Sequence, residues 1–290
     1  YVTTRLSYAC RYASPLTAED VLAGGLLLLL ALFFIPIYAL VAVVMQRSDK
    51  EIVGFRFLFS AALADLLLLV NYALWPGVII LAKCELVPRT ARPWMQMYLD
   101  WAWFSMCLHY SLIAWSRFAA IRWPNGFRTQ TRRFSYALCA ACYVLALVQV
   151  LATHFQPWYV TFYYEPSAYG MLAEDFLKYM HDGQSLMFLV FHSLMIAIPI
   201  VFYTYAIVLL IKHKKRGGGE MNGQRQSATN VESRLILPCI INSAVFIVGQ
   251  VLITVGTGEG RWATWTVMLV FSANSAVNPL LYICCSSIIR

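Results

Sequence analysis

The sequence contains few charged residues. Only 12% of its 290 residues are Asp, Glu, Lys or Arg, whereas 60% are hydrophobic, and the mean hydropathy is +0.64. A soluble globular domain carries about 25% charged residues, so this chain has too few polar side chains to cover a water-facing surface. The composition therefore indicates a membrane protein.

The sequence also lacks the motifs of several functional classes. It has no His-Glu-x-x-His, no Gly-x-Ser-x-Gly and no pair of intramembrane aspartates, so we expect no enzymatic activity. The eight cysteines follow no metal-binding spacing, and the basic residues form no nucleic-acid-binding motif. The last apolar segment has no lysine to hold retinal, which excludes a retinal-based light receptor. No internal repeat of the kind common in transporters is visible.

Seven apolar segments are present, each long enough to cross a hydrocarbon core of about 30 Å, which takes about 20 helical residues. Seven such segments in one short chain leave almost no polar shell, which argues against a soluble helical protein. We therefore predict an all-α, polytopic membrane protein, a bundle of seven transmembrane helices. The predicted helices lie near 21–46, 55–81, 94–121, 134–155, 185–211, 234–256 and 262–285.

Lys and Arg residues between these segments predict the orientation. They are concentrated in alternate loops, above all in the loop after the fifth segment, whereas the other loops also contain acidic residues. By the positive-inside rule the N-terminus lies outside. Residues 1–20 are then an extracellular arm, and 286–290 are a cytosolic stub of a truncated tail. The long outer loop 156–184 is rich in aromatic residues, which predicts a lid over the bundle or, alternatively, aromatics resting among the lipid headgroups.

Two cysteines are placed to face the oxidising side of the membrane. Cys10 lies in the outer arm and Cys84 follows the second apolar segment. Disulfides form in extracellular compartments, so we predict a bond between these two residues.

The last apolar segment contains an Asn-Pro pair, Asn278-Pro279, within the run Asn274 to Tyr282. Proline removes a backbone donor and kinks a helix, and the bilayer core offers no water for the freed carbonyl. Asp65, deep in the second apolar segment, is costly there and marks an ion site, a proton site or a polar network, or else is a structural hydrogen-bonded residue. Both features predict a buried polar cluster.

Three motifs, in this order and at these depths, resemble the rhodopsin-like G-protein-coupled receptors. They are Leu63-Ala64-Asp65-Leu66-Leu67, Ser116-Arg117-Phe118 and Asn274-Ser275-Ala276-Val277-Asn278-Pro279-Leu280-Leu281-Tyr282. Further fragments resemble the nematode serpentine chemoreceptors of the Srg superfamily, with its Srv, Srt and Srx branches. These are Ile35-Pro36-Ile37-Tyr38, Gly54-Phe55-Arg56-Phe57 and the run from Arg117 to Pro124.

The resemblance implies a conformational switch. Asp65 is expected to join the asparagines of the last helix, and Arg117 is expected to pair across the bundle with Glu232, or alternatively to extend to the headgroups. In the family this carboxylate often binds sodium, but Met106 occupies the position that often supplies a hydroxyl, so we expect no cofactor. The expected switch residues are Asp65, Arg117, Glu232, Phe246, Asn274, Ser275, Asn278, Pro279 and Tyr282.

Several positions differ from the family pattern. Ser116 replaces the acid before Arg117, and Gln250 stands where the family has a tryptophan. Arg92 occupies the position of the cysteine that usually bonds the second extracellular loop, so that disulfide is absent.

We expect a ligand pocket between the outer halves of the helices. Asp100 in this region is suited to an amine or a hydroxyl-rich ligand, although it can equally face Arg92 or the headgroups, and His192 can equally be a packing residue. The residues expected to line the pocket are Trp75, Gln96, Leu99, Asp100, Trp103, Phe104, His192, Gln250, Trp265, Met268 and Ser272.

The predicted function is that of a chemosensory receptor. Its partners would be a small-molecule odorant or pheromone, a heterotrimeric G protein and membrane lipid, and its location the plasma membrane, in the cilia of sensory neurons. The alternatives are a receptor for a peptide or an amine, and a transporter of a small solute. A receptor is favoured because only Asp65 is expected to be buried deeply, whereas a transport path needs several intramembrane charges.

Overall fold

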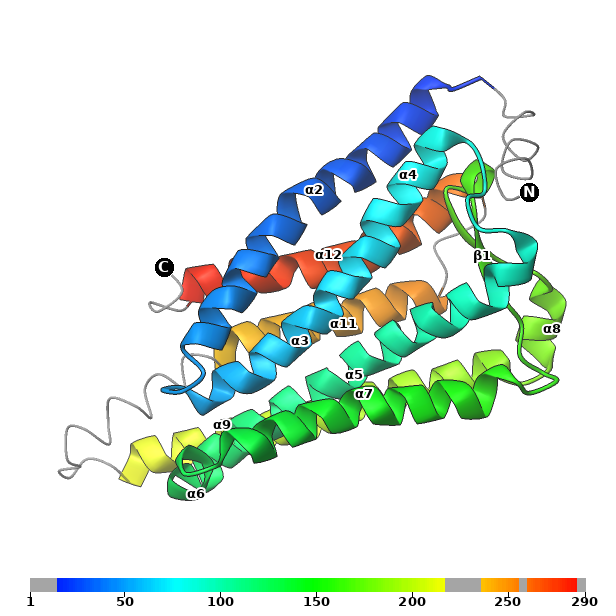
Figure 1. Ribbon diagram of the computed structural model, residues 1–290. Coiled ribbons are helices and arrows are strands. Elements are labelled where there is room, and N and C mark those ends of the chain that lie inside the picture. Colours follow the sequence, from blue (N-terminus) through cyan, green and yellow to red (C-terminus); the bar gives the residue numbers. More distant parts are fainter. Residues whose placement is uncertain (1–14, 217–235, 256–259, 286–290) are drawn as a thin grey trace.

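The computed structural model describes residues 15–216, 236–255 and 260–285. They form an elongated bundle of long helices with one small antiparallel sheet at its end (Figure 1). In chain order the elements are α2 (Ala18–Arg47), α3 (Val53–Leu69), the π-helical turn η1 (Val70–Leu74), α4 (Trp75–Ala82), the 3-10 turn η2 (Arg89–Ala91), α5 (Arg92–Arg122), α6 (Pro124–Arg128), α7 (Arg132–His154), β1 (Phe162–Glu165), the 3-10 turn η3 (Pro166–Ala168), β2 (Gly170–Ala173), α8 (Phe176–His181), α9 (Gln184–Arg216), α11 (Ile236–Val255) and α12 (Arg261–Cys285).

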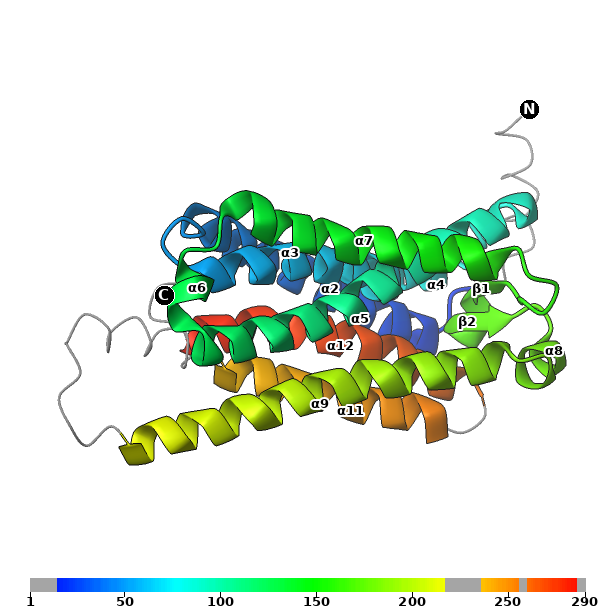
Figure 2. The ribbon, with the colours of Figure 1, turned by 90° about the horizontal axis from the view of Figure 1, so that it is seen from below.

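In the described part of the chain, seven helical spans make up the bundle. Five are long and apolar enough to cross a membrane, namely α2, the continuous rod of α3, η1 and α4, then α7, α9 and α12. The 31-residue α5 is less apolar because it is the central helix and carries buried polar side chains, and the 20-residue α11 completes the set. Figure 2 shows α5 in the middle, between α7 and α12. The predicted all-α bundle is confirmed, with helix ends a few residues from those expected.

We call the end of the bundle where α2 begins the outer end and the opposite end the inner end, following the predicted orientation. The hairpin of β1 and β2 and helix α8 lie at the outer end, and α6 lies at the inner end (Figure 1). Thr17 and Asp20 form a capping box that starts α2, and Thr131 caps α7 by accepting a bond from the backbone N–H of Phe134.

The second span widens into a π-helical turn because of Pro76. The N–H of Trp75 bonds to the carbonyl of Val70, five residues back, and Pro76 has no N–H to offer the next carbonyl, that of Asn71. The hydroxyl of Tyr164 in the hairpin donates to this carbonyl at 2.6 Å. A side chain 93 residues away in sequence thus satisfies the backbone acceptor that the proline leaves open.

The outer loop packs on the bundle, as the lid interpretation predicts. Phe162 pairs with Ala173 and Glu165 with Gly170 in the hairpin. Tyr164 and Tyr169 are 4% and 0% exposed, because both point down between the outer ends of the helices. Tyr169 has a positive φ of 57°, a strained conformation for a non-glycine residue that its buried contacts maintain.

Candidate functional site

Asp65 is the centre of a buried polar layer that joins three helices. Its carboxylate accepts a hydrogen bond from Tyr38 of α2 at 2.6 Å, from Asn278 of α12 at 2.7 Å and from Ser275 of α12 at 3.2 Å. Asp65 itself is 1% exposed, so these donors replace the water that the carboxylate would otherwise need. The expected partnership with Ser275 and Asn278 is present, and Tyr38 is an additional partner.

Asn274 belongs to the same layer through a different partner. Its Nδ2 donates to the hydroxyl of Tyr110 in α5 at 2.9 Å, and that hydroxyl donates to Asn242 in α11 at 3.5 Å. Asn274, expected in one network with Asp65, is thus bonded through Tyr110 rather than directly to the Asp65 carboxylate in the described structure. Together with the Asp65 contacts, these bonds link α2, α3, α5, α11 and α12 through buried side chains.

Two buried acceptors in this layer have no partner among the described residues: the Oδ1 atoms of Asn274 and Asn278. Met106, where the family often has a hydroxyl, is 1% exposed and offers no oxygen. Among the described residues, no cluster of three His, Cys, Asp or Glu side chains is arranged to hold a metal ion.

Towards the inner end, Arg117 is fully buried. Its Nη2 donates to the backbone carbonyl of Gly54 at 3.3 Å, so the side chain does not extend to the headgroups and that alternative is wrong. Ser116 bonds to the carbonyl of Ile113 of its own helix. Glu232, the expected partner of Arg117, lies outside the described residues.

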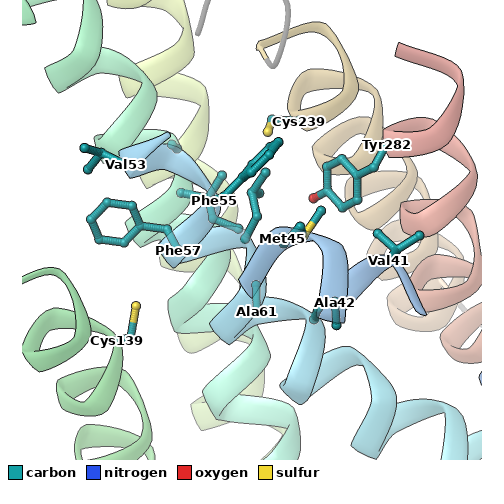
Figure 3. Packing of buried hydrophobic residues seen from close by; sticks show 14 of the residues in the cluster. Val41, Ala42, Met45, Val53, Phe55, Phe57, Ala61, Cys139, Cys239 and Tyr282 are labelled. Atoms are coloured by element: carbon teal, nitrogen blue, oxygen red, sulfur yellow. The ribbon is translucent and has the colours of Figure 1, made fainter. Parts of the chain in front are cut away.

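Tyr282 is buried in the core of the inner half of the bundle. It is 3% exposed and belongs to the apolar cluster of Met45 and Phe55, towards which its ring points in Figure 3. Pro279 lies inside α12, one turn before it, and is buried. The end of α12 is thereby packed against α2 and α3, next to the polar layer.

An aromatic cluster lies in the outer half of the bundle. Trp103 of α5 donates its Nε1–H to Nε2 of His192 in α9 at 2.8 Å, which requires the histidine nitrogen to be unprotonated. The Trp103 ring meets Phe271 of α12 edge-on, with centroids 4.5 Å apart, and Phe271 stacks on Tyr72 at 4.7 Å. Four spans therefore contribute a ring to one cluster.

Phe246 of α11 connects this cluster to the polar layer. Its ring lies 6.1 Å from that of Trp103 and 5.1 Å from that of Tyr110. Tyr110 belongs to the polar layer because it bonds to Asn274. Along this path, Phe246 is therefore the one side chain between the Trp103 ring and the polar layer. Phe246, expected among the switch residues, therefore contacts both the aromatic cluster and a residue of the polar layer.

Asp100 lies three residues before Trp103 in α5 and has polar partners of its own. Its carboxylate accepts bonds from Gln96 at 2.8 Å and from Tyr159 of the outer loop. Arg92, the other partner considered, instead bonds to Glu85 at 2.6 Å and Glu174 at 3.0 Å. Asp100 is 7% exposed, so the expectation that only Asp65 is deeply buried is wrong. The Oε1 of Gln96 has no partner among the described residues.

The remaining expected pocket residues are divided among separate contacts. Trp265 donates to the carbonyl of Ala23 at 3.0 Å, and Ser272 bonds within its own helix to the carbonyl of Met268. Phe104 packs against Phe188 and Phe191 of α9, and both of these rings contact His192. Leu99 and Met268 are buried, the Nε1 of Trp75 has no partner among the described residues, and the side chain of Gln250 lies outside them.

At the outer end a polar clamp holds the hairpin. Asp20 accepts bonds from Lys83 at 2.6 Å and from the Tyr169 hydroxyl at 2.8 Å. Arg261 bonds to the same hydroxyl and to Glu19. Burial and the bond to Asp20 raise the pKa of Tyr169, so it stays a donor at physiological pH.

Cys84 lies directly beside this clamp. It is 5% exposed and disulfide-bonded. Its expected partner, Cys10, lies outside the described residues, so the pairing of these two cysteines stays a prediction.

Most of the site residues that the sequence did not predict are tyrosines. Tyr38 and Tyr110 hold the polar layer, Tyr72 belongs to the aromatic cluster, and Tyr159 covers Asp100. A tyrosine in an apolar helix resembles any packing aromatic in sequence. These tyrosines could have been expected on one ground: the buried carboxylates of Asp65 and Asp100 need hydrogen-bond donors, and the hydroxyl of a tyrosine can be one.

The arrangement of the seven spans is that of a known receptor class. The structure is similar to the crystal structure of squid rhodopsin, with a TM-score of 0.75 over 94% of this chain and 83% of that chain, at 14% sequence identity. The fold is therefore that of the rhodopsin-like receptors.

The family model of the serpentine type 7TM GPCR chemoreceptor Srx matches residues 28–280. The chain belongs to this family and is a multi-pass G-protein-coupled receptor, a class of non-enzymes. A search of curated protein sequences finds no match.

Proposed function

We propose that this receptor detects a small organic molecule, an odorant or pheromone, and responds by activating a heterotrimeric G protein. Its place would be the plasma membrane, in the cilia of a sensory neuron. The ligand would act on the outer half of the bundle, at the cluster of Trp103, His192 and Phe271, and the G protein would bind at the inner end.

The observation that carries this proposal is the continuous contact from Trp103 through Phe246 and Tyr110 to Asn274. A ligand shifts a two-state equilibrium only by binding the two states differently. A molecule that displaces the Trp103 ring changes the packing of Phe246 and, through it, the hydrogen bonds of the polar layer. This layer spans five helices, so a change in it alters how their inner ends are packed.

The inner end supports the second half of the proposal. Arg117 is buried there against Gly54, while Lys50, Arg122, Arg128, Arg133 and Lys212 are exposed. An exposed basic face attracts an acidic partner. Arg117, released from its buried position, would add a cation to that face.

The test is guanine nucleotide exchange on purified heterotrimeric G proteins by the receptor in nanodiscs, during a screen of small secreted metabolites. Ligand-dependent exchange supports the proposal. Ligand flux into liposomes without exchange would favour the transporter. A response only to peptides or amines would favour the alternative receptor types, and an amine at Asp100 would have to displace Tyr159.

We propose further that the receptor needs no cofactor. Asp65 already accepts three hydrogen bonds from protein donors, and Met106 offers no ligand oxygen. The melting temperature should therefore be equal in sodium chloride and in choline chloride. A rise in sodium would assign the two free amide oxygens of Asn274 and Asn278 to a cation.

A further inference from the structure

A groove lies at the inner end, where α5, α6 and α7 meet, away from both the polar layer and the aromatic cluster. It has a volume of about 510 Å³ and is lined mainly by Trp115, Trp123, Phe127 and Phe134, with Gly126 and Gln130. This volume is within the range of small-molecule sites, about 300–1,000 Å³. Its walls are largely aromatic, so an apolar occupant fits it best.

The groove opens towards lipid rather than towards the core. Phe134 is 55% exposed and shares a face of α7 with Leu145 and Val148, which are 58% and 57% exposed and follow at 11 and 14 residues. Such a row of exposed apolar side chains on a membrane-spanning helix faces acyl chains. The groove is therefore the inner end of a lipid-facing surface.

The surroundings of the groove are basic. The segment 115–136 contains five arginines and no acidic residue. Arg117 is buried and Arg132 bonds to Asp49 at 2.7 Å, whereas Arg122, Arg128 and Arg133 are exposed and adjacent in sequence to lining residues. The Nε2 of Gln130 is a buried donor that has no partner among the described residues.

We propose that this groove binds one acyl chain of an anionic phospholipid of the inner leaflet, with the phosphate held by Arg128 and Arg133. The aromatic walls accommodate the chain, and the exposed Arg128 and Arg133, which have no acidic neighbour in the segment 115–136, complement the headgroup charge. Basic pockets between transmembrane helices on the cytoplasmic side are suited to such headgroups. The bound lipid would brace α6 against α5 and α7. The inference is independent of the identity of the extracellular ligand.

The experiment is native mass spectrometry of the purified full chain with equimolar phosphatidylserine and phosphatidylcholine. Arg128→Gln with Arg133→Gln removes the proposed headgroup contacts, and Lys50→Gln with Lys212→Gln is the charge-matched control at the same end. Gly126→Leu adds a side chain to the lining of the groove, and it is tolerated sterically because a Cβ at Gly126 meets no atom within 4 Å. Gly25→Leu, equally open on α2, is its control.

We expect the wild type to retain phosphatidylserine over phosphatidylcholine. The double arginine variant should lose about 25-fold in phosphatidylserine affinity, since each basic residue near the surface contributes about fivefold. Gly126→Leu should abolish retention, while both controls bind like the wild type. Equal retention of the two lipids, unchanged binding by Gly126→Leu, or an equal loss in the lysine control would overturn the proposal. A melting temperature equal to that of the wild type shows that each variant is folded.

Discussion

The hydroxyl of Tyr38 donates a 2.6 Å hydrogen bond to the carboxylate of Asp65, and both residues are buried, at 0% and 1% exposure. This contact ties α2 to the polar layer of α3 and α12. α2, α3, α5, α11 and α12 each contribute a side chain that is hydrogen-bonded in the layer. The strength of these bonds therefore determines how firmly the layer holds its arrangement.

Tyr38→Phe should lower the free energy of unfolding by about 1–2 kcal/mol, because it removes a bond to a buried carboxylate and adds no atoms. The measurement is thermal unfolding of purified receptor with a thiol-reactive dye, since Cys107, Cys139, Cys142 and Cys239 are buried and become reactive on unfolding. Tyr205→Phe, at a 61% exposed tyrosine, is the matched control. Equal melting curves for Tyr38→Phe and wild type would show that the bond contributes nothing.

Phe246→Leu should separate ligand binding from signalling. The substitution keeps an apolar side chain but removes the ring between Trp103 and Tyr110, so a displacement of Trp103 is no longer passed by ring contact to Tyr110, the residue that bonds to Asn274. For an agonist found by screening, we expect an affinity within about threefold of wild type, less than 1 kcal/mol, and a large loss of stimulated nucleotide exchange. Val248→Leu, at an exposed position two residues further along α11, is the control. Full exchange by Phe246→Leu would refute the proposed contact path.

Tyr164→Phe should cost about 1–3 kcal/mol, because it leaves the carbonyl of Asn71 without a donor inside the bundle. Pro76→Ala restores an N–H to the same turn, so Tyr164→Phe should cost less in that background. The double-mutant cycle measures the coupling directly. Additive effects of the two substitutions would mean that Tyr164 does not replace the donor that Pro76 lacks.

Lys83→Met should loosen the hairpin. It removes the 2.6 Å ion pair to Asp20, the residue that also accepts the bond from Tyr169. Hydrogen–deuterium exchange of residues 162–173 should become faster by about fivefold, equivalent to about 1 kcal/mol of opening free energy. Asp182→Asn, an exposed acid of the same outer loop, should leave the rate unchanged. Equal protection in Lys83→Met and wild type would show that the clamp does not hold the lid.

The fold was predictable because bilayer-crossing helices need long apolar runs, and these are local in sequence. Asp65 was predictable as a site for the same reason, since a carboxylate in such a run is costly. Its partners Ser275 and Asn278 came with the motif of the last helix, but Tyr38 did not, because a phenol in an apolar helix has no distinctive pattern.

Asp100 shows what sequence patterns could not supply. Its helix position predicts a carboxylate in the outer half, and the structure places one there. Whether it meets a ligand, Arg92 or Tyr159 depends on the path of the loop 59 residues away, and no local rule fixes that path. The expected pocket residues face several different neighbours for a similar reason. The rotation of each helix about its axis depends on the helices packed against it, and a local sequence pattern does not fix that rotation.

The π-helical turn also has a consequence for how the receptor is made. The ribosome delivers Asn71 to the membrane well before Tyr164, which lies 93 residues later in the chain. During that interval the carbonyl of Asn71 lacks the hydrogen bond from the Tyr164 hydroxyl. The outer half of the second span therefore cannot yet form all the hydrogen bonds of the finished structure. Those hydrogen bonds are complete only after the loop that follows the fourth span has been synthesised and has packed on the bundle. Docking of the lid is therefore a late step in the folding of the helices beneath it.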